Sequence, residues 1–157
     1  MEDPEDYDED DGIAEINPDF TFVDDIFVRI AKKEEEKGAK SLTNEQQVLG
    51  TVWHVAGIVE NGGLSSFLER KFDVEEAARA YEAVGMPKSA AILRQTLTIF
   101  PYSRRPASSK KLLQFIDEHE EFLESLSKKF LHREKNLEKA LISYIEDHPA
   151  AFKEFMG

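Results

Sequence analysis

From Phe20 onward, apolar residues recur three and four positions apart, the spacing that gathers them on one face of an α-helix. The two segments that alternate as a strand would, 20–23 and 96–100, lie inside longer helical patterns. No repeat of the length that builds solenoids is present. The sequence therefore predicts an all-α fold, a single compact bundle of about six to seven helices.

The expected helix ends follow from capping residues and glycines. Thr21 is expected to cap the first helix, which should stop at Gly38. The second helix should open at Ser41 or Thr43, with Glu45 and Gln46 as possible capping-box partners, and glycines should end it at 61–63. After a loop at 101–109, one long helical stretch is expected. The residues expected in the core are Trp53, Phe67, Tyr81, Leu93, Leu97, Phe122 and Leu141.

Length and composition favour one domain. A chain of 157 residues with 41% hydrophobic residues is long enough to bury an ordinary core. We expect residues 1–19 to form an acidic, flexible extension and residues 20–157 to form one helical domain. The chain has no cysteine, its N-terminus is acidic, and no apolar run approaches the roughly 20 residues of a membrane span. These features predict a soluble, cytoplasmic protein without disulfides.

The negative charge is concentrated at the N-terminus. The formal net charge is −12, and residues 1–25 carry no Lys or Arg. The 20 Lys and Arg are therefore balanced by the acidic residues of 26–157. The acidic residues of 1–25 are Glu2, Asp3, Glu5, Asp6, Asp8, Glu9, Asp10, Asp11, Glu15, Asp19, Asp24 and Asp25. Such a block is typical of an interaction tail or of a solubilising extension, and both interpretations stay open.

Two sets of carboxylates are candidate partner-binding residues. The first lies in the tail and comprises Asp6, Asp8, Glu9, Asp10 and Asp11. The second comprises Asp117, Glu120, Glu121 and Glu124, which on one helix would form an acidic stripe. Neighbouring carboxylates on such a stripe lie about 5–6 Å apart, of the order of successive phosphates on a DNA strand. The alternative is local neutralisation, with Glu124 paired to Lys128, and Glu134 or Glu138 paired to nearby lysines.

A basic cluster occupies the proline-rich loop and the residues after it, at Arg104, Arg105, Lys110 and Lys111. It is either a docking site for the acidic tail or a solvated loop. Because no basic surface dominates the chain, direct binding to nucleic acid is disfavoured.

No set of residues suggests catalysis. The four histidines have no pair at the helical spacing of a zinc site, and no nucleophile elbow or phosphate-binding loop is present. His119 stands among acidic residues, but consecutive helical residues cannot converge on one ion. We therefore predict no catalytic residue, no metal site and no cofactor.

A series of short motifs carries a family resemblance. They are 59–67 (VENGGLSSF), 81–85 (YEAVG), 90–93 (AAIL), Phe100-Pro101 and 145–152 (IEDHPAAF). In this order they resemble the family of DNA mimic protein C-terminal-like domains, small all-helical bacterial proteins, across most of residues 45–155. Leu64 stands where that family usually has an aromatic residue, and Ser66 where it usually has glutamine. The motif turn at Asn61, Gly62, Gly63 and Phe67 is interpreted as a fold element, because glycines suit a helix terminus.

These features favour a non-catalytic module that engages the basic surface of a protein. The resemblance implies occupation of a transcription factor's DNA site by mimicry. The alternatives are an immunity or antitoxin-like inhibitor of one cognate protein, an uncharacterised helical domain without mimicry, and an enzyme. A neighbouring gene for a toxin would favour the inhibitor, and a neighbouring repressor gene would favour the mimic.

Overall fold

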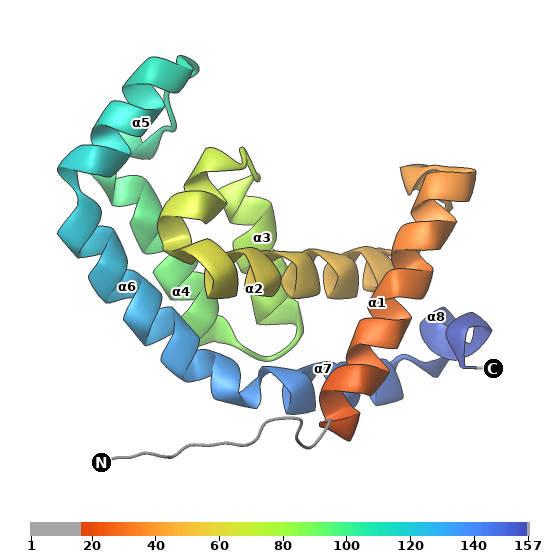
Figure 1. The fold of residues 1–157 in the computed structure, drawn as a ribbon. Helices are drawn as coiled ribbons and strands as arrows, with labels where there is room; N and C mark the ends of the chain where they lie inside the picture. Colours follow the sequence, from red (N-terminus) through yellow and green to blue (C-terminus); the bar gives the residue numbers. More distant parts are fainter. Residues whose placement is uncertain (1–16, 157) are drawn as a thin grey trace, which may run out of the picture.

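The computed structural model describes residues 17–156, which fold as an all-α bundle without strands (Figure 1). The predicted all-α bundle of about six to seven helices is confirmed. The predicted acidic extension lies almost wholly outside the described residues. None of the helices within residues 17–156 is long and apolar enough to cross a membrane.

Helix α2 is the central element of the bundle. It packs against α1 near its start and against α3 and α6 further along, whereas α3 and α4 pack on each other (Figure 1). Helix α7 returns to pack on α1, so the first helix and the last long helix lie side by side. The helices are α1 (Pro18–Lys37), α2 (Asn44–Glu69), α3 (Val74–Ala83), α4 (Pro87–Gln95), α5 (Ser109–Glu118), α6 (Glu120–Arg133), α7 (Leu137–Asp147) and the short α8 (Pro149–Phe152).

Among the described residues, side-chain caps set four of the eight α-helix starts, those of α1, α2, α3 and α5. The Thr43 hydroxyl accepts the Gln46 amide at 3.1 Å, while the Gln46 side chain accepts the Thr43 amide at 3.1 Å, so the predicted capping box is present. The expectation that Thr21 caps α1 is wrong. Asn17 takes that place by accepting the Asp19 amide at 2.9 Å, and Pro18 suits the first helical position.

The glycine motif bends α2 instead of ending it. Gly63 has φ 75° and ψ −176°, a conformation open almost solely to glycine, and the helix then continues to Glu69. The bend frees the Leu64 amide, which donates to the Ser127 hydroxyl of α6 at 2.9 Å. A side chain on Gly62 would meet Ser66. The predicted helix stop is therefore a kink, held by one hydrogen bond to a neighbouring helix.

The long helix expected after the 101–109 loop is two helices. At His119 (φ −119°, ψ 28°) the chain leaves the helical conformation between α5 and α6. The His119 amide donates to Ile116 O at 3.1 Å, and its ring Nδ1 lies 2.8 Å from Phe115 O. The imidazole thus satisfies the carbonyl that the backbone amide of a continuous helix would have satisfied.

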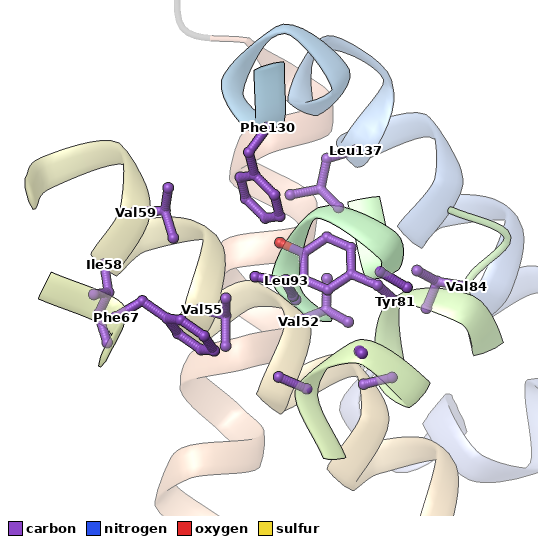
Figure 2. Close-up of a cluster of buried hydrophobic side chains, with 14 of the residues drawn as sticks. Val52, Val55, Ile58, Val59, Phe67, Tyr81, Val84, Leu93, Phe130 and Leu137 are labelled. Atoms are coloured by element: carbon purple, nitrogen blue, oxygen red, sulfur yellow. The ribbon is translucent and has the colours of Figure 1, made fainter. Parts of the chain in front are cut away.

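The core lies where α2, α3, α4 and α6 meet, and Figure 2 shows Tyr81 within it. Four of the expected core residues, Phe67, Tyr81, Leu93 and Leu141, are fully buried. Trp53 and Leu97 are only partly buried. Phe122 was expected in the core and is 41% exposed, because α6 begins anew after His119 and turns Leu123 and Leu126 inward instead.

Candidate protein-interaction site

The acidic residues predicted as a stripe lie on two helices. Asp117 is in the last turn of α5, whereas Glu120, Glu121 and Glu124 are in the first turns of α6, so the break at His119 separates them. All four are exposed. We call Glu120, Glu121 and Glu124 the α6 acidic turn.

The α6 acidic turn presents its charge to solvent. Among residues 17–156, no ion pair includes any of its three carboxylates, and the expected pair between Glu124 and Lys128 does not form. Glu120 and Glu121 stand at the positive end of the helix dipole, which stabilises carboxylates there. The turn is therefore a fixed group of negative charges available to a partner.

The acidic tail residues Asp6, Asp8, Glu9, Asp10 and Asp11 lie outside the described residues. The described chain starts at Asn17, whose side-chain amide donates to Glu138 of α7 at 2.8 Å. The described part of the chain therefore begins where α1 meets α7.

A pocket of about 860 Å³ lies between α1, α2 and the junction of α6 with α7. Its volume falls within the roughly 300–1,000 Å³ of ordinary ligand sites. Phe20 and Phe27 of α1 and Trp53 of α2 supply aromatic rings, and the Phe20 and Trp53 ring centroids are 5.3 Å apart. The Trp53 indole N–H donates to Asp24 at 3.0 Å, which fixes the ring at the pocket wall.

The charged residues of the pocket are mostly acidic. Four carboxylates line it, those of Asp24, Glu60, Glu134 and Glu138. Its two basic residues are Arg70 and Lys135, which leaves a local excess of negative charge.

Glu134 lines this pocket and has a raised pKa. It lies in the 3-10 turn η4 (Glu134–Asn136), where Oε1 accepts the Tyr81 hydroxyl at 2.9 Å. Its Oε2 is buried without a hydrogen-bond partner among the described residues. Burial raises the pKa of Glu134 to about 7, and the negative charge of Glu60 also raises it, against the lowering effect of the Tyr81 hydrogen bond.

The tyrosine responds to the same environment. Burial, followed by the charge of Glu134, raises the pKa of Tyr81 well above its ordinary value. The hydroxyl therefore stays protonated as the donor of this pair. The sequence-based expectation that Glu134 or Glu138 pairs with nearby lysines is not met, since Glu134 binds Tyr81 and Glu138 binds Asn17.

The basic loop contributes to the fold. Arg105 donates to the carbonyl oxygens of Leu68, at 3.4 Å, and Phe72, and thus caps the end of α2. Burial lowers the pKa of its guanidinium. Arg104, Lys110 and Lys111 are exposed. Of the predicted basic cluster, Arg105 is therefore a structural residue.

Two of the four histidines also serve the fold. Like His119, His148 satisfies a carbonyl at a helix end, with its Nδ1 2.8 Å from the carbonyl oxygen of Tyr144 at the end of α7. Within residues 17–156, no group of three His, Asp or Glu side chains is arranged to hold a metal ion.

The motif turn forms part of the pocket wall. Asn61 and Gly62 line the pocket, whereas Phe67 is fully buried and does not line it, and Gly63 makes the kink. Sequence reasoning did not find the pocket. The one sequence signal that could have indicated it is Gly57, a glycine inside a helical pattern. Gly57 lines the pocket, and a Cβ added to it would have no atom within 4 Å.

The fold and this site define an all-α bundle protein that carries an acidic helix turn and an acidic, aromatic pocket. Comparison with protein-family models matches residues 40–148 with the DMP19-like protein family. The match covers more than half of the chain, so the protein belongs to the DMP19-like family, that of DNA mimic protein 19. The resemblance to DNA mimic proteins noted from the sequence is confirmed. Neither the curated proteins nor the solved structures gave a significant match.

Proposed function

We propose that this protein is a non-catalytic interaction module that binds the basic, DNA-contacting surface of a DNA-binding protein and thereby excludes DNA. Membership in the DMP19-like family suggests DNA mimicry, and proteins of the DNA mimic kind are generally non-enzymatic. A partner that binds the chromosome implies a cytoplasmic location in a bacterium.

The observation that carries the proposal is the α6 acidic turn. Its carboxylates are exposed, unpaired among the described residues, and held on a helix. Carboxylates three and four positions apart on a helix are about 5–6 Å apart, of the order of successive phosphates, and complementary charge speeds encounter and selects partners.

The proposal is tested by affinity capture from the native host. The full-length protein is compared with a variant that carries Glu120→Lys, Glu121→Lys and Glu124→Lys. The matched control carries Glu34→Lys, Glu35→Lys and Glu36→Lys, which changes the net charge equally at the exposed C-terminal end of α1.

We expect the full-length protein and the control to capture a DNA-binding protein that the α6 variant loses. Circular dichroism must show that all three proteins remain folded. Equal capture by the α6 variant and the control would show that these carboxylates are not the recognition surface. Capture of a single enzyme instead of a DNA-binding protein would favour the inhibitor alternative.

A further inference from the structure

We infer that the pocket between α1, α2 and α7 is a receptor for an arginine side chain projecting from the basic surface of the protein partner. The inference rests on the proposed function for the origin of the arginine, and the pocket itself supplies its chemistry. The pocket and the α6 acidic turn lie at opposite ends of α6, about 20 Å apart by the helical rise per residue. One partner of ordinary interface size can contact both.

Space for this side chain comes from glycine. Gly57 lies in the interior of α2, where glycine costs about 1 kcal/mol relative to alanine. Neither a positive φ nor a close neighbour requires glycine at this position, because an added Cβ would meet nothing within 4 Å. Its missing side chain instead leaves the pocket open beside Trp53.

Charge decides between a cation and an anion as the occupant. Four carboxylates and two basic residues line the pocket, so a cation is attracted to it more than an anion is. The acidic tail is a poor occupant, because nine of the residues before Asn17 are carboxylates and would be repelled. A basic segment of another protein is attracted to the same carboxylates and can donate hydrogen bonds to them.

The aromatic lining favours arginine among the cationic side chains. A guanidinium stacks on aromatic rings and donates to carboxylates through several N–H groups, whereas an ammonium is compact and more strongly hydrated. Phe20, Phe27 and Trp53 provide the rings, and Glu60 and Glu138 provide acceptors at the same pocket. The pocket therefore combines both kinds of contact that a guanidinium makes.

Trp53 reports directly on occupancy, because it is the only tryptophan of the chain. The probe is a blocked pentapeptide of sequence Gly-Arg-Gly-Arg-Gly, and the control peptide carries citrulline, the neutral isostere, at both arginines. The full chain is titrated with each peptide while the indole N–H resonance and the fluorescence of Trp53 are followed. We expect a saturable change with the arginine peptide and at least a tenfold weaker apparent affinity with the citrulline peptide.

Two pairs of variants locate the binding. Gly57→Leu fills the pocket, and Gly57→Ala is its control, since both remove the glycine from the helix. Glu60→Gln removes a pocket carboxylate, whereas Glu69→Gln removes an exposed carboxylate of the same helix outside the pocket lining. We expect Gly57→Leu to abolish the Trp53 response and the smaller Gly57→Ala to weaken it less. Glu60→Gln should weaken binding at least threefold, with Glu69→Gln near the wild type.

Three results overturn the inference: no saturable response with the arginine peptide, equal binding of the citrulline peptide, or equal binding by both members of each variant pair. Should Gly57→Leu not fold, the Glu60 and Glu69 pair decides. Failure here is distinct from failure of the proposed function. If the wild type does not bind the arginine peptide but the α6 variant still fails to capture the partner, the proposed function stands and the inferred role of the pocket is wrong.

Discussion

Replacing Glu134 with glutamine removes a charge that burial disfavours and keeps an oxygen for the Tyr81 hydroxyl. Burial raises the pKa of Glu134 from 4.5 to about 7 in the folded protein. The folded state therefore holds this proton more tightly than the unfolded state. The tighter binding of this proton stabilises the folded wild type fully below the pKa of the unfolded state. This stabilisation is lost as the pH rises through the pKa of the folded state.

The magnitude follows from the size of the shift. The difference between 4.5 and about 7 corresponds to about 3 kcal/mol of stability lost by the wild type between pH 4 and pH 8. Glutamine has no charge to bury, so Glu134→Gln escapes this loss. Its buried NH₂ adds a cost that does not depend on pH, because no acceptor stands at the Oε2 position.

The assay is urea denaturation of both proteins, followed by circular dichroism at half-unit steps from pH 4 to pH 8.5. We expect the free energy of unfolding of the variant, minus that of the wild type, to rise by about 3 kcal/mol across this range. Subtraction removes the opposite contributions of Glu75 and Glu82, whose pKa values hydrogen bonds from Arg94 lower. A difference that does not change with pH would contradict the raised pKa of the buried Glu134 carboxyl.

Three further perturbations test the kink and the tail. Ser127→Ala leaves the Leu64 amide buried without an acceptor and should cost about 1–3 kcal/mol of unfolding free energy in urea; no loss would mean that the kink needs no such bond. Gly63→Ala forces a side chain into a glycine conformation and should cost about 1–3 kcal/mol in the same assay, whereas an unchanged midpoint would contradict the kinked geometry. Removing residues 1–16 should slow association with the captured partner at low salt, because electrostatic steering is lost, and leave the dissociation rate nearly unchanged in stopped-flow measurements. A change confined to the dissociation rate would instead mean that the tail contacts the partner directly.

The sequence predicted the features that local chemistry controls. The capping box at Thr43 depends on residues three positions apart, and the all-α class depends on apolar spacing along each helix. The fully buried Phe67 and Tyr81 belong to helices whose phase the sequence predicted correctly. Both kinds of feature arise from neighbours along the chain.

Most features that the sequence did not predict depend on partners far along the chain. Helix α2 continues past the bend at Gly63 because the hydroxyl of Ser127, distant in sequence, accepts the hydrogen bond of the freed Leu64 amide. One missed feature is local: the His119 side chain bonds to the preceding turn and ends α5, and this break exposed Phe122 and divided the acidic stripe. Trp53 lies at the pocket edge because Asp24 of α1 accepts its indole N–H.

Glu134 shows the same limitation for the site. In sequence it stands between Arg133 and Lys135, where an ordinary ion pair is the simplest prediction. Its actual partner is Tyr81 of α3, and the pocket forms only when α1, α2 and α7 assemble. Tertiary packing therefore buries this glutamate and gives it its raised pKa.

The central claim is that the α6 acidic turn competes with DNA for a partner's basic surface. Its most direct test is fluorescence anisotropy of a labelled DNA duplex bound to the captured DNA-binding protein. Added wild-type protein should release the duplex in a saturable manner, and the Glu34, Glu35 and Glu36 lysine control should do the same. The variant with lysine at Glu120, Glu121 and Glu124 should not release it. Release of the duplex by that variant at wild-type concentrations, or simultaneous binding of DNA and the wild-type protein, would contradict the claim.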